Sequence, residues 1–397
     1  MAEWVERKIS DIGTVVGGAT PSTKKPENYK DGKIAWITPK DLSTFSSRYI
    51  ERGERNITEI GLKSCSTQLL PPNTVLFSSR APIGYIAIAA NEVCTNQGFK
   101  SVIPNENTDP LFLFYLLKYN KDKIEGMGSG TTFKEVSGNT MKNIVVNVPT
   151  DKKVQEKIAA ILGSIDDKIE ENEQINNNLE EQLSALFVNM FGHSIDSLDN
   201  SDIKLGDLIE SVDNRGKTPP LSDEPTDYPI IDVRALSGNS RIIDYTNCTK
   251  YVSKETYDNW FRSGHPKEYD ILISTVGSLA EMKIFLGTIG CIAQNVVGFR
   301  TKGISPLYLY QYLNYIKNDL VAYNIGSVQP SIKVTHIIKH SIYVASKEDI
   351  EIFDGIARNI TKKIFENCQE NEALKQMRDT LLPKLMSGEL DVSNIKI

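Results

Sequence analysis

The chain has 397 residues, 40% of them hydrophobic and 24% charged, with a formal net charge of −6. This length predicts two or three domains with their own cores, and the composition is that of an ordinary soluble protein. The longest apolar runs, such as 83–90, are too short to cross a membrane, and no secretory leader is recognisable. We therefore expect a cytoplasmic protein whose five cysteines, none closely paired, are reduced thiols.

The charge is unevenly distributed along the chain. Residues 1–150 carry 18 Lys+Arg against 15 Asp+Glu, and residues 193–347 carry 16 against 17. The acidity lies in residues 151–192 and 348–397, which together carry 11 basic against 19 acidic side chains. The net charge of the whole chain is therefore no argument against a nucleic-acid partner.

Each of the two less acidic segments contains both strand and helix signals. Short β-branched or aromatic runs at 75–77, 85–88 and 144–148, and again at 271–274, 284–286 and 342–344, predict strands. Residues 111–119 and 307–315 each follow a proline and predict helices. We therefore expect two mixed α+β globules, at 1–150 and 193–347.

The segments 151–192 and 348–397 each predict one long helix with a heptad seam. Apolar and asparagine residues alternate at spacings of four and three, which is the pattern of helices that pair in coiled coils. The seam residues are Ile158, Leu162, Ile165, Ile169, Asn172, Asn176, Leu179, Leu183 and Leu186 in the first helix, and Ile360, Ile364, Asn367, Asn371, Leu374, Leu381 and Leu385 in the second.

Globule and helix together are duplicated. Six ordered matches, including "KISDI" with "KLGDL" and "NTVLFSS" with "YDILIST", recur at offsets of 196–198 residues. An antiparallel helix pair sets Asn172 against Asn371 and Asn176 against Asn367, whereas a parallel pair sets Asn172 against Asn367. The periodicity alone does not choose between them, but only the antiparallel form separates the globules. Solvation of these asparagines at a gap in the seam is the alternative interpretation.

Motifs for catalysis are absent from the sequence. It contains no phosphate-binding GxxxxGK[ST], no dinucleotide glycine fingerprint, and no HExxH, CxxC or GxSxG. His336 and His340 could share a helix face, but no third metal ligand lies near them, so we expect packed or solvated histidines. The glycine-rich stretch 126–130 could form an anion nest, although a surface loop fits it better because no Lys directly follows. We expect no catalytic and no metal site.

Hydrogen-bond donors recur at strand ends and in loops of both globules. Arg, Lys, Asn, Gln, Ser and Thr side chains donate to phosphates and read base edges. The candidate DNA-binding residues are Trp36, Lys40, Ser78, Ser79, Arg80, Gln97, Lys100, Ser129, Thr131, Thr132 and Lys134 in the first globule, and Arg215, Lys217, Arg234, Ser274, Thr275, Gln294, Asn295, Arg300, Ser327, Gln329 and Lys333 in the second. Arg80 is the sharpest candidate, and its counterpart is Val276, so the two halves are expected to read different sequences.

The duplicated plan is accompanied by the motifs "QEKIAAIL" at 155, "LLPKLMSGEL" at 381, "WITPKDL" at 36 and "LFSSRAPIG" at 76. In these features the sequence resembles the specificity subunit of type I restriction-modification systems. The resemblance covers the whole chain and implies that each globule is a target recognition domain for one half of a split DNA site. It further implies that the helices form an antiparallel coiled coil and dock two modification subunits. One departure is that Leu382–Lys384 has no counterpart near Phe187.

The same resemblance places the cofactors elsewhere. It implies that S-adenosylmethionine, ATP and magnesium belong to the modification and restriction subunits, and that this chain is not itself an enzyme. A helix of about 35 residues rises roughly 50 Å, against about 34 Å for one turn of B-DNA, so paired helices could fix the gap between half-sites. The competing interpretation is a coiled-coil adaptor that binds protein partners without DNA contact.

Overall fold

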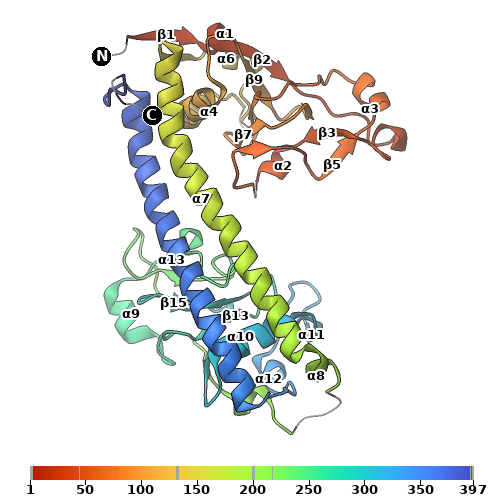
Figure 1. Cartoon of the computed structure of the whole chain (residues 1–397), viewed down its shortest axis with the longest axis vertical. Helices are drawn as coiled ribbons and strands as arrows, with labels where there is room; N and C mark the ends of the chain where they lie inside the picture. The colour runs from red at the N-terminus through yellow and green to blue at the C-terminus, as the bar shows by residue number, and fades with distance from the viewer. Residues whose placement is uncertain are drawn as a thin grey trace. The chain divides into compact units, whose positions relative to one another are not determined.

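A computed structural model describes residues 3–43, 45–130, 134–198, 202–216, 218–393 and 395 (Figure 1). The chain divides into two compact units. Unit 1 consists of Met1–Glu170 and Glu372–Ile397, and unit 2 of Glu171–Asn371. Helices α7 (Lys152–Phe187) and α13 (Lys347–Met386) each contribute one part to each unit.

The described residues of unit 1 form three sheets. The largest has the strand order β2-β9-β6-β7-β4, the second β5-β3-β8, and the third pairs β1 with β10. The elements are β1 (Trp4–Lys8), α1 (Ile9–Ile12), β2 (Gly13–Gly17), η1 (Pro26–Asn28), β3 (Ile34–Ile37), α2 (Pro39–Leu42), β4 (Tyr49–Ile50), β5 (Arg55–Ile57), α3 (Glu59–Lys63), β6 (Val75–Phe77), β7 (Ile86–Ala89), β8 (Val93–Thr95), β9 (Lys100–Pro104), α4 (Pro110–Tyr119), α5 (Lys121–Gly126), α6 (Gly138–Asn143) and β10 (Val145–Pro149).

Where the structure describes unit 2, its strands form two sheets, of order β11-β16-β13-β14 and β12-β15. After α7 the chain continues through a π-helical turn, η2, into a short helix. The elements are η2 (Val188–Gly192), α8 (His193–Asp196), η3 (Leu205–Asp207), β11 (Ile209–Val212), β12 (Ile230–Ile231), η4 (Tyr245–Asn247), α9 (Lys254–Trp260), β13 (Ile271–Ser274), β14 (Met282–Ile284), β15 (Cys291–Ile292), β16 (Val296–Thr301), α10 (Pro306–Tyr315), α11 (Lys317–Ala322) and α12 (Val334–Ile337).

The topology confirms the duplication. The order β2-β9-β6-β7 of unit 1 returns as β11-β16-β13-β14, and the parallel pair β3-β8 returns as β12-β15. The pairing register is kept as well, since Val75 opposes Val102 and Ile271 opposes Phe299. Helices α4 and α10 both begin at a proline, after an Asp109 or Ser305 side chain that caps the first free N–H groups. Both units are therefore mixed α+β folds, as predicted.

The long helices complete the core of each unit. In unit 1 the start of α7 and the end of α13 lie side by side (Figure 1), and Ile158, Leu162 and Leu385 join one buried cluster with α4. In unit 2 Phe187 and Phe353 pack edge to face with ring centroids 5.5 Å apart, within a buried cluster that includes α10. The helices therefore belong to the folded units and cannot be removed from them without exposing these cores.

The helix pair is antiparallel. In unit 2 Asn172 Nδ2 donates to Asn371 Oδ1 at 2.9 Å, and Asn367 Nδ2 donates to Asn176 Oδ1 at 2.8 Å. The four asparagines are between 1% and 7% exposed, which rules out the solvated alternative. All sixteen predicted seam residues are buried or half-buried. In unit 1 Arg378 of α13 extends the pairing through an ion pair of 2.8 Å with Asp166 of α7.

Two predicted strands differ from the structure. The strand expected at 284–286 lies at Met282–Ile284, because Ile271–Ile273 of β13 pair with those residues. The strand expected at 342–344 is wrong: around it the structure has a single bridge between Lys204 and Ser341. Ile342 N still donates to Ile203 O at 3.1 Å, but at the next residue tyrosine hydroxyls bind the backbone: Tyr308 donates to Tyr343 O, and Tyr343 N donates to the Tyr312 hydroxyl.

In the described part of the chain, no helix combines the length and the apolar character needed to cross a membrane.

Candidate DNA interface

In unit 1, three segments converge at the end of strand β6. The residues after β6 meet the turn before β9 and the loop before α6. Ser79 N donates to Gly98 O at 2.7 Å, and Val136 N donates to Ser79 O at 2.9 Å. The third segment closes on itself, since Ser129 N donates to Glu135 O at 3.0 Å. We call this convergence the unit 1 edge, formed by residues 78–80, 97–100, 128–130 and 134–136.

Glu135 lies at the centre of the unit 1 edge and binds two of the predicted donors. Arg80 Nε lies 3.0 Å and Lys100 Nζ 3.5 Å from its carboxylate. Burial alone raises the pKa of Glu135, but Arg80 and Lys100 outweigh it and leave the pKa below its ordinary value. Arg80 remains 46% exposed. A guanidinium has five N–H groups that can bind a guanine edge or a phosphate, and for Arg80 the Glu135 carboxylate competes with such a partner.

Unit 2 has an equivalent of each of these three main-chain hydrogen bonds. Thr275 N donates to Asn295 O at 2.8 Å, Ile332 N to Thr275 O at 2.9 Å, and Ile325 N to Ser331 O at 2.9 Å. The bridge Arg80–Glu135 has its counterpart in Val276–Ser331. We call this the unit 2 edge, formed by residues 274–277, 294–296, 325–327 and 329–333. It carries neutral side chains where the unit 1 edge carries an ion pair, so the two edges offer different chemistry on one framework.

The structure sorts the predicted DNA-binding residues by exposure. Eleven are exposed, three are half-buried, five are buried and three lie outside the described residues. The exposed ones are Lys40, Arg80, Gln97, Ser129, Lys134, Arg215, Arg234, Gln294, Ser327, Gln329 and Lys333; the half-buried ones are Lys100, Asn295 and Arg300; the buried ones are Trp36, Ser78, Ser79, Ser274 and Thr275; and Thr131, Thr132 and Lys217 lie outside the described part.

The five buried residues hold the framework and do not present side chains to a partner. Trp36 is 4% exposed within β3, and its indole N–H donates to Ala19 O at 3.2 Å. Ser78 and Ser274 hold the turn after their strands, donating to Pro82 O at 2.9 Å and to Ser278 O at 2.5 Å. In this structure these five side chains are therefore buried and are not presented to a partner.

Four of the predicted basic residues already have acidic partners away from the two edges. Lys40 pairs with Glu54 at 2.8 Å and Arg300 with Asp270 at 2.7 Å. Arg215 and Arg234 each pair with the aspartate two residues before them, at 2.5 and 2.7 Å. Gln294 is different, because its Nε2 donates to Thr218 Oγ1 at 3.1 Å and so connects the segment that follows β11 to the unit 2 edge.

Some important residues were not predicted. Glu135 lies 55 positions from Arg80, and no spacing in the sequence indicates that they pair. Arg48 and Arg241, both buried, contact helix α7, and a signal for them did exist. The pattern Ser-Arg-Xaa-Ile occurs at 47–50 and again at 240–243, as a further element of the duplication.

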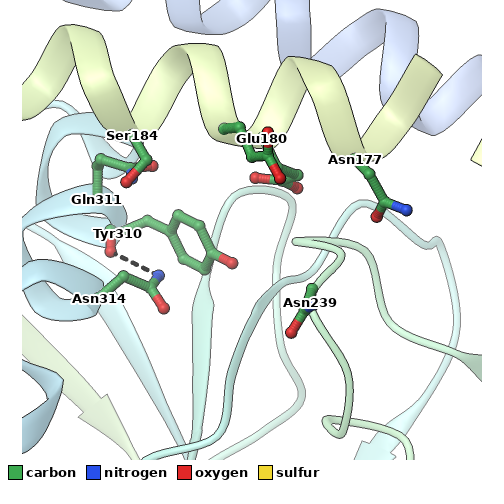
Figure 2. Close-up of a pocket in the computed structure, with 8 residues that line it drawn as sticks. Asn177, Glu180, Ser184, Asn239, Tyr310, Gln311 and Asn314 are labelled. Atoms are coloured by element: carbon green, nitrogen blue, oxygen red, sulfur yellow. Dashed lines mark hydrogen bonds between the residues drawn. The ribbon is translucent and has the colours of Figure 1, made fainter. Parts of the chain in front are cut away.

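A polar pocket of about 390 Å³ lies in unit 2 between α7 and α10. Figure 2 shows Asn177, Glu180 and Ser184 of α7 above Tyr310 and Asn314 of α10, with Asn314 Nδ2 donating to Tyr310 O at 3.0 Å. The remaining lining residues are Glu181, Asn239 and Gln311. Its amide and carboxylate groups can accept hydrogen bonds, but a nucleophile paired with a base is not among the lining residues.

His336 and His340 do not share one helix face. Helix α12 ends at Ile337, before His340, and the Tyr323 hydroxyl lies 2.8 Å from His340 Nδ1. Burial lowers the pKa of His340 below its ordinary value. Within the described ranges, no group of three His, Cys, Asp or Glu side chains is arranged to hold a metal ion.

The fold and the edges define a class of protein: a duplicated scaffold with two unlike polar edges and an antiparallel pair of long helices. The family model of the "Type I restriction modification DNA specificity domain" matches residues 1–181 and 198–376. The chain therefore belongs to the specificity subunit family of type I restriction-modification systems.

Individual relatives agree with this assignment. The type I restriction enzyme MjaIX specificity subunit of Methanocaldococcus jannaschii is 32% identical over 426 aligned positions, covering 99% of this chain and 95% of that protein. The HindI specificity subunit of Haemophilus influenzae is 25% identical and covers 98% of this chain and all of its own length. The crystal structure of the S subunit from M. genitalium shares the fold, with a TM-score of 0.58 at 17% identity over 99% of this chain and 97% of that one.

Proposed function

We propose that this chain is the DNA-specificity subunit of a type I restriction-modification complex, in which each edge reads one half of a two-part duplex site. The observation that carries the proposal is the repeated scaffold with unlike occupants, Arg80 and Glu135 on one edge and Val276 and Ser331 on the other. Two copies of one framework with different side chains are what reading two different half-sites requires.

The exposed donors of each edge are suited to this role. Arg80, Gln97, Ser129 and Lys134 belong to the unit 1 edge, and Ser327, Gln329 and Lys333 belong to the unit 2 edge. Arginine pairs with guanine, glutamine pairs with adenine, and lysine contacts phosphates. In this proposal Arg80 and Gln329 read bases while Lys134 and Lys333 bind the backbone.

The chemistry of methylation and cleavage belongs to partners in this proposal. Two modification subunits dock on the helices and supply S-adenosylmethionine, and restriction subunits supply ATP hydrolysis with magnesium. The chain itself acts as the non-catalytic reader. Support comes from the family membership, since the matching family model describes a DNA specificity domain.

The test is duplex binding by the chain assembled with its modification subunits, followed by fluorescence anisotropy at increasing salt. Phosphate contacts make the affinity fall linearly on a log–log plot, with a slope of about −0.9 for each phosphate neutralised. We expect a slope of several units and a preference for one duplex sequence. Equal, salt-insensitive binding of all duplexes, or none, would support the adaptor interpretation instead.

A further inference from the structure

In each unit, one of the contacts between the globule and the long helices is made by a buried arginine. Arg48 is 6% exposed and Arg241 is 0% exposed. They are structural counterparts, because the carbonyl of Arg48 accepts Ile88 N at 2.7 Å and that of Arg241 accepts Ile284 N at 2.8 Å, at equivalent points of β7 and β14. The duplication has therefore kept one arginine per unit at the same place in the fold.

In unit 2 the side chain of Arg241 joins three helices. Its main-chain N–H donates to Glu180 Oε1 of α7 at 2.8 Å, and its Nε and Nη2 reach the same carboxylate at 3.0 and 2.6 Å. Nη1 donates to Thr361 Oγ1 of α13 at 2.9 Å, and the guanidinium lies 5.4 Å from the ring centre of Tyr310 of α10. Figure 2 shows Glu180 extending from α7 toward the loop that carries Asn239.

In unit 1 Arg48 repeats the contact with α7. Its main-chain N–H donates to Glu170 Oε1 at 3.0 Å, its Nε reaches the same oxygen at 3.3 Å, and Nη2 also binds Asp167. Nη1 donates to Gly163 O at 3.3 Å. A Cβ at Gly163 would lie 3.3 Å from Nη1 and 3.1 Å from Leu111 Cδ2, so glycine leaves the space that the arginine fills.

The loop that carries Arg241 is itself held in place. The Nζ of Lys283 in β14 donates to Gly238 O at 2.8 Å and also to Ser240 O. Gly238 has a positive φ of 86°, which favours glycine. The backbone of Arg241 is therefore held by the loop, and its guanidinium is held by the Glu180 carboxylate, so both parts of the residue have a defined position.

Stability alone does not explain such a pair. Buried ion pairs are often no more stabilising than apolar residues of similar volume, because desolvation offsets the attraction. A buried ion pair instead provides geometric specificity. When a planar guanidinium and a main-chain N–H bind the same carboxylate, the loop and the helix can adopt one relative orientation, and apolar packing does not impose this. The apolar contacts around Phe187 already attach the globule to the helices.

We propose that Arg48 with Glu170, and Arg241 with Glu180, are positioning residues that fix the orientation of each recognition globule on the helices and thereby restrict the complex to one gap length between half-sites. This inference rests on the proposed function. The residues contact no base in this scheme; they act through the placement of the edges.

The test uses the chain assembled with its modification subunits and a panel of duplexes whose half-sites are separated by the natural gap or by one or two base pairs more or fewer. The main variant is Arg241→Met with Glu180→Met, which removes both charges together. Initial methylation rates are compared between gaps within each variant. Loss of folded protein lowers all rates equally and leaves their ratio unchanged, so the ratio reports positioning and not stability.

We expect the double variant to keep both half-site sequences while the rate on altered gaps, relative to the natural gap, rises about tenfold, equivalent to roughly 1.4 kcal/mol. Glu180→Gln, which keeps the size and an acceptor, should relax the ratio less and covers the case in which the double variant fails to fold. The matched control is Lys254→Ala with Asp258→Ala, an exposed pair in the same unit with side chains 70% and 48% exposed, which should leave the ratio unchanged.

Two results are distinguishable. If the folded double variant keeps the wild-type preference for one gap length, the positioning role is wrong and the proposed function is unaffected. Where the double variant does not fold, the same result for Glu180→Gln has the same meaning. A wild-type complex that methylates none of the duplexes overturns the proposed function and this inference with it.

Discussion

Replacing Arg80 by alanine should weaken recognition of one half-site while the other stays unchanged. A bidentate arginine–guanine contact contributes about 1–3 kcal/mol of discrimination. Arg80 must first leave Glu135, and because the two side chains are 46% and 37% exposed, that ion pair is worth only about 0–1 kcal/mol. The net loss therefore lies between about 0 and 3 kcal/mol, and its midpoint of about 1.5 kcal/mol corresponds to roughly tenfold in affinity.

Glu135→Gln should have the opposite effect at the same edge. This substitution removes the carboxylate that competes for Arg80 and a negative charge near the phosphates, so the affinity for DNA should increase. The increase should be up to about fivefold, because a surface ion pair is worth up to about 1 kcal/mol. Anisotropy titrations of the assembled complex against duplexes altered in one half-site at a time measure both effects. Lys254→Ala, which breaks an exposed ion pair with Asp258 at a position that is not among the predicted DNA-binding residues, is the control.

The reasoning would be refuted by a uniform loss of affinity across all duplexes for Arg80→Ala, because that result identifies a phosphate contact and not a base contact. Weaker binding by Glu135→Gln would equally contradict the view that Glu135 competes with DNA for Arg80.

Three further predictions follow from other parts of the chain. Gln329→Ala should weaken the base preference at one base pair of the second half-site, which sequencing of the methylated sites measures. A changed base preference in the first half-site would contradict this assignment. Asn172→Leu with Asn371→Leu should raise the unfolding free energy, because a buried asparagine pair at a seam costs stability, and should also weaken the preference for one gap length between half-sites. Urea titration measures the first effect and the duplex panel measures the second. A lower urea midpoint or a stronger preference for one gap length would contradict this prediction. Burial lowers the pKa of Lys283 from 10.5 to about 8, so the unfolded chain binds a proton that the folded chain releases between these pH values, and stability from this group rises with pH. The unfolding free energy of wild type relative to Lys283→Met should therefore increase by about 3 kcal/mol from pH 8 to 10.5, and a flat difference would show that Lys283 titrates normally.

The helices could be predicted well because their signal is local. The heptad pattern recurs every two turns, and asparagines interrupt both seams at equivalent places. The sequence therefore left two possible partners for Asn172, namely Asn371 and Asn367, and the structure shows Asn371. The choice between parallel and antiparallel pairing needed three-dimensional information. The strand expected at 342–344 failed because tyrosine hydroxyls from α10, rather than a neighbouring strand, bind its backbone at Tyr343.

The edges were predicted only in part, since a residue's type does not reveal its exposure. Ser79 and Thr275 have donors of the right kind, but their main chains tie together the loops of the edge and bury their side chains. Glu135 was missed because pairing across 55 residues leaves no periodic trace. Arg48 and Arg241 could have been found from the repeated Ser-Arg-Xaa-Ile, which shows that the duplication contained more information than the helix seams alone.

The most direct test of the central claim, that two unlike edges read two half-sites, is a base-resolution map of adenine methylation in DNA exposed to the assembled complex. The account predicts one motif made of two different short sequences separated by an unread gap of constant length. A continuous motif, or a motif whose halves are inverted copies of each other, would contradict it, because the Arg80–Glu135 edge and the Val276–Ser331 edge could not then be reading separate sequences.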